Sequence, residues 1–176
     1  MICLVSILTL ATFSACKDDT NGDFFYDVIS FEDFLGRIYD DPYFAERVDN
    51  LEQLTSLCEK AKMSINDKND WHYDSEVYKK FRSYDSKFFK NKSLIVVSII
   101  QGNPHSLEFA KLTIYNDVLT ISLLSNYNPY ETGGDYLDES DPRLFLIEIS
   151  KDSIKDVNQI KVITYYDLGE TIPSRP

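Results

Sequence analysis

The most apolar segment after residue 16 is residues 93–100, where hydrophobic side chains occupy odd and even positions alike. A strand with one face in water is polar at every second position, so this pattern predicts a strand covered on both faces. We therefore expect residues 93–100 to be the central strand of the fold, with helices on one face. An aromatic and charged turn, residues 84–92, leads into it.

Residues 109–115 and 118–124 alternate apolar and polar side chains, as half-buried strands do, and Asn116 and Asp117 reverse the chain between them. We expect these two strands to form an antiparallel meander with residues 93–100. In the second strand the side chains expected inward are Leu119, Ile121 and Leu123, with Thr120 and Ser122 outward. In the first, Ala110, Leu112 and Ile114 share one face.

Two later segments complete the predicted sheet. Residues 143–149 are again apolar on both faces, and residues 160–166 give the last strand. The fold class expected is α+β, with short N-terminal helices packed on a five-stranded, mainly antiparallel β-sheet or small sandwich. A single domain would span residues 31–170, between a tether at residues 16–30 and a tail at residues 171–176.

Helical spacing precedes the strands. Ser30 begins a capping box, and apolar residues recur at helical intervals over residues 31–38. A second helix is expected at residues 48–61, with Asp49 or Asn50 as its N-cap.

A further helical turn is expected from Ser75 onward, and Asp85 is placed to cap the turn that holds Phe88 and Phe89. Residues 79–92 contain six Lys and Arg residues, the one basic stretch of an acidic chain. Aromatic residues interrupt it at core spacing, so we interpret it as the solvated face of a helix. Contact with anionic lipid or a cell-wall polymer is the alternative.

The first residues predict export. Residues 2–15 carry no charge, and this run is shorter than a membrane-spanning helix requires. Ser14 and Ala15 precede Cys16 as small residues precede the lipidated cysteine of bacterial lipoproteins. We expect residues 1–15 to be a lipoprotein signal peptide and Cys16 to be the lipidated anchor on the extracytoplasmic face of the cell membrane. Plain secretion and an uncleaved anchor are the alternatives.

The cysteine content and the net charge bear on disulfide formation and on the kind of partner. With Cys3 removed and Cys16 lipidated, Cys58 has no disulfide partner, and its place on an apolar helix stripe is typical of a buried thiol. The formal net charge of −11 disfavours a nucleic-acid partner, because phosphate binding requires a positive surface.

Two segments are candidates for ligand contact. Residues 125–142 form a long loop rich in Asn, Gly, Pro, Asp and Tyr, and such loops are often functional. Trp71, the only tryptophan, stands beside His72 in another polar segment. We interpret Trp71 as packing its loop onto the core. An exposed aromatic that binds a sugar ring is the alternative.

No catalytic motif is present. The chain lacks GxSxG, HExxH and a glycine-rich phosphate loop, and it has only two histidines. The carboxylates at residues 135–141 do not have the spacing of a calcium-binding EF-hand loop. We therefore expect no enzymatic activity, no cofactor and no metal.

The segment YDSKFFKNKSLIVVSI, the hairpin KLTIYNDVLTISLL and the strand RLFLIEISKD occur in this order between residues 84 and 163. This order resembles small bacterial lipoproteins of unknown function whose second half is similar to the PrcB-type C-terminal domain, named for a protease-complex subunit. In that family a turn rich in Tyr and Phe precedes the first strand, as Tyr84, Phe88 and Phe89 do here. The family often has Gly-Tyr at the entry to the second strand, where this chain has Ser106 and Leu107.

The expected function is a non-enzymatic protein-interaction module, anchored in the membrane through Cys16, that binds an envelope protein. A carbohydrate or cell-wall binding protein that uses Trp71 and the loop tyrosines is the alternative. The residues expected in the partner-binding loops are Asn103, Pro104, His105, Tyr127, Tyr130 and Tyr136.

Overall fold

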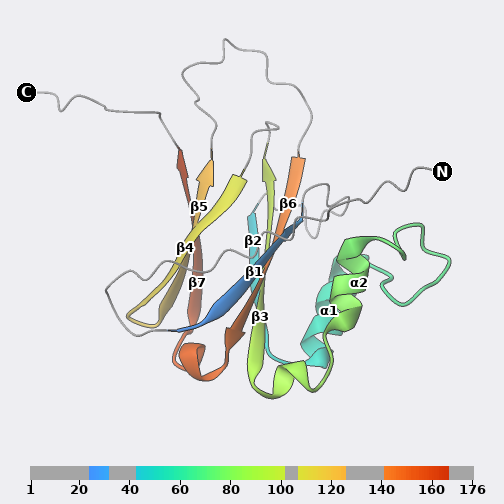
Figure 1. Cartoon of the computed structure of the whole chain (residues 1–176), viewed down its shortest axis with the longest axis horizontal. Helices are drawn as coiled ribbons and strands as arrows, with labels where there is room; N and C mark the ends of the chain where they lie inside the picture. The colour runs from blue at the N-terminus through green and yellow to red at the C-terminus, as the bar shows by residue number, and fades with distance from the viewer. Residues whose placement is uncertain (1–23, 32–42, 102–106, 126–140, 167–176) are drawn as a thin grey trace, which may run out of the picture.

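The computed structural model describes residues 24–31, 43–101, 107–125 and 141–166. These residues form two stacked β-sheets, with helices on the outer face of one sheet (Figure 1). The strands are β1 (Tyr26–Phe31), β2 (Tyr43–Val48), β3 (Lys92–Gln101), β4 (Leu107–Tyr115), β5 (Val118–Ser125), β6 (Asp141–Ser150) and β7 (Gln159–Tyr166). The helices are α1 (Leu51–Lys60), α2 (Glu76–Ser83) and the 3₁₀ turns η1 (Phe88–Lys90) and η2 (Asp152–Ile154).

The strands divide into a four-stranded sheet in the order β1-β6-β3-β2 and a three-stranded sheet in the order β4-β5-β7. All neighbours pair antiparallel except β5 and β7, which are parallel. The α+β class is confirmed. The prediction of five strands is wrong, because β1 and β2 add two strands to the four-stranded sheet.

The central position predicted for residues 93–100 is confirmed, because β3 lies between β6 and β2. Leu94 and Val96 pack in a core with the helices, whereas Ile95 and Val97 pack in a second core between the two sheets. All four side chains have 0% exposure. Helices therefore cover one face of β3 and the second sheet covers the other.

The predicted meander of β3, β4 and β5 is wrong. β3 pairs with β2 and β6, and the β4–β5 hairpin belongs to the other sheet. The reason lies in coverage: β6 is also apolar on both faces, with Leu144 and Leu146 toward the helices and Phe145 and Ile147 toward the second sheet. The two doubly covered strands lie side by side in the middle of one sheet.

The mainly antiparallel pairing that was predicted is confirmed, and the last strand is the exception. β6 ends at Ser150, η2 turns the chain at that end of the sandwich, and β7 then runs in the same direction as β5 (Figure 1). The pairing extends from Val118 opposite Gln159 to Ser125 opposite Tyr166. A crossover between the sheets thus produces the parallel pair.

The predicted tether and first helix require correction. Residues 26–31 form β1, which pairs with β6 so that Val28 lies opposite Ile147. Ser30 is therefore in a strand rather than at a helix N-terminus, and residues 32–38 lie outside the described residues. Val48, expected in the second helix, is the last residue of β2.

Two details of the second sheet also differ from strict alternation. A β-bulge between Phe109 and Lys111 shifts the register of β4, so Ala110 is exposed while Leu112 is buried. Leu119, Ile121 and Leu123 face the core as predicted. Ser122, on the opposite face of β5, is nevertheless only 2% exposed; it lies between β4 and β7 in the register.

The capping predictions other than that at Ser30 are confirmed. Asn50 accepts a hydrogen bond from Gln53 N at 2.8 Å as the N-cap of α1, and Ser75 accepts one from Tyr78 N at 3.2 Å as the N-cap of α2. The Asp85 carboxylate accepts one from Phe88 N at 2.8 Å. Asn116 and Asp117 both have positive φ, as a tight hairpin turn requires. In the described part of the chain, neither helix has the length and apolar character needed to cross a membrane.

Candidate binding surfaces

Strands of both sheets begin or end at one end of the sandwich. The pairings place Gln101 opposite Asp141, Leu107 opposite Ser125, and Ser125 opposite Tyr166. The last residues of β3, β5 and β7 and the first residues of β4 and β6 therefore share one end, which we call the loop end (Figure 1). Both segments predicted to bind a partner are attached there.

The predicted contact residues themselves lie outside the described residues. They are Asn103, Pro104, His105, Tyr127, Tyr130 and Tyr136. Cys16, the predicted lipidation site, also lies outside them.

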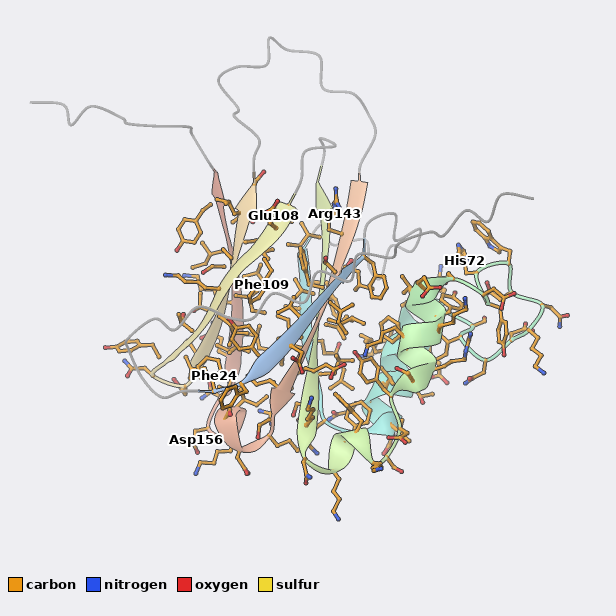
Figure 2. All side chains as sticks on the ribbon, in the orientation of Figure 1. Phe24, His72, Glu108, Phe109, Arg143 and Asp156 are labelled. Atoms are coloured by element: carbon orange, nitrogen blue, oxygen red, sulfur yellow. The ribbon has the colours of Figure 1, made fainter. Side chains whose placement is uncertain are left out.

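Near the loop end, two charged residues differ in burial. Arg143 in β6 is 8% exposed, whereas Glu108 in β4 is exposed (Figure 2). The guanidinium group is the cation best suited to such a position, because it is weakly hydrated and has five donors in a fixed geometry. Asp156 lies at the opposite end of the sandwich in the same view.

A second surface surrounds Trp71, and here the preferred interpretation is wrong. The Trp71 side chain is 79% exposed and does not pack on the core. Its ring stacks on the neighbouring His72 ring, with 3.5 Å between the centroids and an interplanar angle of 38°. The loop that carries it, residues 62–75, projects beyond the helix pair, as the position of His72 in Figure 2 shows. We call this segment the Trp71 loop.

The Trp71 loop is a succession of hydrogen-bonded turns. Backbone hydrogen bonds of 2.8 to 3.1 Å join Asp67 N to Ser64 O, Asp70 N to Asp67 O, Tyr73 N to Asp70 O and Ser75 N to His72 O. Arg82 of α2 holds the loop from below, because its guanidinium donates to the carbonyl oxygens of Ile65 and Tyr73, both at 2.7 Å. The same guanidinium lies 4.0 Å from the centroid of the Tyr73 ring.

His72 is fixed beneath the indole. The Asp70 carboxylate accepts the His72 backbone N–H at 2.8 Å and contacts Nδ1 at 3.3 Å. The Tyr78 ring also lies near His72, with 5.6 Å between the ring centroids, and burial and the charge of Asp70 raise the pKa of Tyr78. His72 Nε2 is buried and has no hydrogen-bond partner among the described residues.

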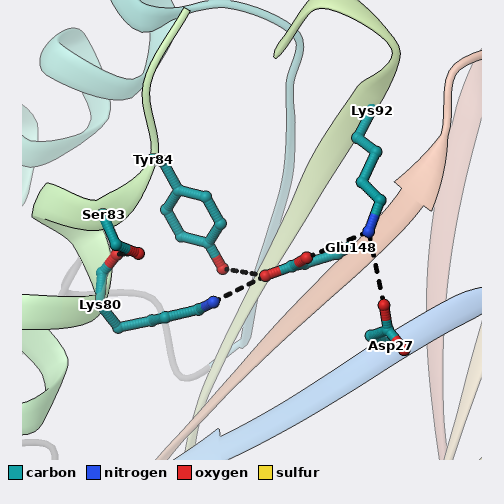
Figure 3. Close-up of polar contacts among 6 residues, drawn as sticks. All are labelled: Asp27, Lys80, Ser83, Tyr84, Lys92 and Glu148. Atoms are coloured by element: carbon teal, nitrogen blue, oxygen red, sulfur yellow. Dashed lines mark hydrogen bonds and ion pairs between the residues drawn. The ribbon is translucent and has the colours of Figure 1, made fainter. Parts of the chain in front are cut away.

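A third polar group, the Glu148 cluster, consists of Glu148, Lys80, Tyr84, Lys92 and Asp27 (Figure 3). Glu148 Oε1 accepts hydrogen bonds from Lys80 Nζ at 2.7 Å and from the Tyr84 hydroxyl at 3.2 Å. Lys92 Nζ lies 3.4 Å from Glu148 Oε2 and 3.4 Å from Asp27 Oδ2. The cluster thereby joins α2, β1, β3 and β6.

The electrostatics of the Glu148 cluster favour a structural role. Burial alone would raise the pKa of Glu148, but the ammonium groups of Lys80 and Lys92 hold it below its ordinary value. Burial and the adjacent carboxylate raise the pKa of Tyr84. A general acid at neutral pH needs a carboxyl with a raised pKa, so Glu148 is not suited to that role, and its bonds hold the helix layer on the sheet.

The Glu148 cluster also corrects the interpretation of residues 79–92 as a solvated face. Lys80 is 28% exposed and bonds to a strand 68 positions away in the sequence. A signal was present in the sequence: Glu148 is a charge between Ile147 and Ile149 in a mainly apolar strand, and such a charge requires partners. The sequence could not identify those partners, which come from α2, its C-cap and β3.

Cys58 is buried in the helix core as predicted. Burial and the charge of Glu59 raise the pKa of its thiol from 9.0 to about 11, so little nucleophilic thiolate forms near neutrality. Within the described ranges, no three His, Cys, Asp or Glu side chains gather closely enough to hold a metal ion. Most of the acidic segment at residues 135–141 lies outside those ranges.

Comparison with known proteins identifies no relative. No protein-family model matches the chain, and searches of curated proteins and of solved structures find no similar protein.

Proposed function

We propose that this chain is an extracytoplasmic, non-enzymatic binding module, held at the membrane by a lipid on Cys16, that binds an envelope protein at the loop end. The observation that carries the proposal is that the two segments predicted to contact a partner, residues 102–106 and 126–140, are both attached to strands at that end. Loops at one end of a rigid sandwich form a common binding architecture, because the sheets position segments that are free to vary.

The connections support the same choice of surface. Residues 126–140 connect β5 to β6 in the other sheet, and this connection is longer than most within a domain and contains three tyrosines. Tyrosine is enriched at protein interfaces because its large ring is apolar and its hydroxyl forms hydrogen bonds. Residues 102–106 attach beside it, so two segments contribute to one surface.

The anchor fits this use. A diacylated Cys16 would hold the chain at the membrane without a spanning helix, since two acyl chains suffice for stable attachment. The polar residues after Cys16 would then separate the sandwich from the lipid surface.

Photocrosslinking in cells tests the surface. A photoreactive phenylalanine analogue is placed at Tyr127, Tyr130 or Tyr136, and at Asp156, at the opposite end of the sandwich, as the matched control. We expect the three loop positions to give a common adduct of defined mass and Asp156 to give none. Equal adducts from both ends, or none from the loop positions, would count against a partner at the loop end.

Palmitate labelling tests the anchor separately. We expect label and membrane association in the unmodified chain and their loss in Cys16→Ser. Label that persists in Cys16→Ser, or a soluble wild-type chain without label, would exclude lipidation at this residue.

A further inference from the structure

Trp71 is held in a fixed position although it is exposed. An indole in water forgoes the burial that its large apolar surface favours, and a large aromatic ring held on an ordered loop offers a flat apolar face for contact. His72 covers one ring face, so the 79% exposure comes from the other face and the edges. The open face is therefore presented outward in one orientation.

The indole is supported from within its own loop. The backbone turns and the Arg82 clamp hold the loop in one arrangement. Such preorganisation lowers the entropy lost on binding, because the loop needs no further ordering.

Polar groups precede Trp71 in the loop. Asp67 Oδ1 accepts hydrogen bonds from Asn69 N at 2.9 Å and from Asn69 Nδ2 at 3.1 Å, which fixes an exposed amide two residues before Trp71. Asp70 follows, with its side chain 15% exposed. An aromatic face beside carboxylate and amide groups matches a sugar ring, whose axial C–H bonds form an apolar face and whose hydroxyls point outward.

The surroundings of Trp71 disfavour a protein partner and an anionic membrane as ligands. A stable protein interface buries about 800 Å² per partner, yet the other large hydrophobics exposed in the described residues lie outside the Trp71 loop: Phe25, Leu51, Tyr115 and Tyr165. An anionic membrane surface attracts polybasic segments, whereas residues 62–74 contain two lysines and three aspartates, a net charge of −1. A single sugar ring needs only one indole face.

We propose that the Trp71 loop is a second binding site, distinct from the loop end, that stacks the apolar face of a neutral β-linked pyranose on Trp71. β-Linked glucose and N-acetylglucosamine units fit best, because their equatorial substituents leave the axial C–H bonds free on both ring faces. The acidic character of the loop selects against uronic acids.

Tryptophan emission tests the site directly, because Trp71 is the only tryptophan of the chain. The full chain is titrated with cellotetraose and with tetra-N-acetylchitotetraose. We expect a saturable blue shift and reduced acrylamide quenching with at least one of them, and no change with polygalacturonate. No shift at millimolar concentrations of either tetrasaccharide overturns the proposal, as does a shift that anionic phosphatidylglycerol vesicles alone produce.

Calorimetry with the same tetrasaccharide and matched variants completes the test. We expect Trp71→Ala to weaken binding by about tenfold or more, and Trp71→Phe to retain part of it. Tyr115→Ala, which removes an exposed aromatic from β4, should leave affinity unchanged. Circular dichroism should match the wild type in each case, because both side chains are exposed. Affinity that survives Trp71→Ala would show that the sugar binds elsewhere.

Discussion

β3 and β5 are both central strands of their sheets, yet their surroundings differ. β3 has Val96 against the helices and Val97 between the sheets, each with 0% exposure. β5 has Ile121 between the sheets, but Thr120 on its other face is only partly buried. A strand that is apolar at every position is therefore covered on both faces. A strand that alternates apolar and polar positions is covered by another layer on one face only, even in the middle of a sheet.

The outer faces of the two sheets differ in a second way. On the four-stranded sheet the Glu148 cluster adds polar bonds between the helix layer and the strands. On the three-stranded sheet the outward lysines Lys111 and Lys161 form no ion pair in the described part of the chain. The helices therefore cover the outer face of the four-stranded sheet, whereas the outer face of the three-stranded sheet carries lysines exposed to solvent.

The largest expected effect separates the buried strand from the alternating one. Val97→Asp places an unpaired carboxylate between the sheets, and we expect a loss above 4 kcal/mol, enough to unfold a typical domain. Thr120→Asp, the control on β5, should cost about 1 kcal/mol or less. Circular dichroism and urea denaturation measure both. A cooperatively folded Val97→Asp protein would show that the face described as interior is open to water.

The next effect concerns the polar bonds of the helix layer. We expect Glu148→Gln to lower the free energy of unfolding at pH 7 by about 1–3 kcal/mol, because a partly buried charge-assisted network loses its acceptor. Glu108→Gln, on the exposed end of β4, should change it by less than about 0.5 kcal/mol. Urea denaturation of both variants gives the comparison. Equal losses would mean that the Glu148 cluster does not stabilise the helix layer.

The contribution of the Glu148 carboxylate to the free energy of unfolding should depend on pH. The folded-state pKa of Glu148 lies below the ordinary value of 4.5, so the carboxylate stabilises the fold fully above pH 4.5. That contribution is lost as the pH falls through the lower, folded-state pKa. We expect the stability gap between wild type and Glu148→Gln to narrow when urea denaturation is repeated at pH 3. A gap that widens on acidification would contradict the direction of the shift.

What the sequence could predict follows the range of each interaction. The caps at Ser75 and Asp85 depend on neighbours three residues away, so spacing identified them, and it narrowed the cap of α1 to Asp49 or Asn50. The burial of β3 depends on its own apolar pattern. β1 escaped prediction because its partner, β6, lies more than 100 positions away in the sequence.

The candidate sites were harder to predict for the same reason. From the sequence, Trp71 could either pack its loop onto the core or lie exposed for contact with a ligand. Only the tertiary arrangement shows that His72 and Arg82 hold its loop away from the core. Lys80 and Lys92 looked like solvent-exposed charges because the carboxylate they share lies on a distant strand. The residue types made these side chains candidates for a contact, and the tertiary fold determines which contacts they make.

A smaller effect tests whether the helix layer opens separately from the sandwich. Cys58 lies in the helix core with a pKa of about 11, so at pH 8 its thiolate fraction is about a hundredfold below that of a free thiol. We expect reaction with a disulfide reagent to be slower by at least that factor in the native protein and to recover in urea. Fast labelling without global unfolding would show that the helices detach while the sheets remain paired.

The smallest effect concerns the open face of the three-stranded sheet. Tyr115 is 68% exposed at the hairpin end of β4, and its register partner Val118 is only partly buried. Because little area is lost, we expect Tyr115→Ala to change the free energy of unfolding by less than about 0.5 kcal/mol, measured by urea denaturation at two protein concentrations. A loss above 1 kcal/mol that depends on protein concentration would mean that a second copy covers this face. β5 would then be covered on both faces, like β3, although its outward side chains are polar. The alternation of apolar and polar residues along β5 would no longer indicate a strand with one open face.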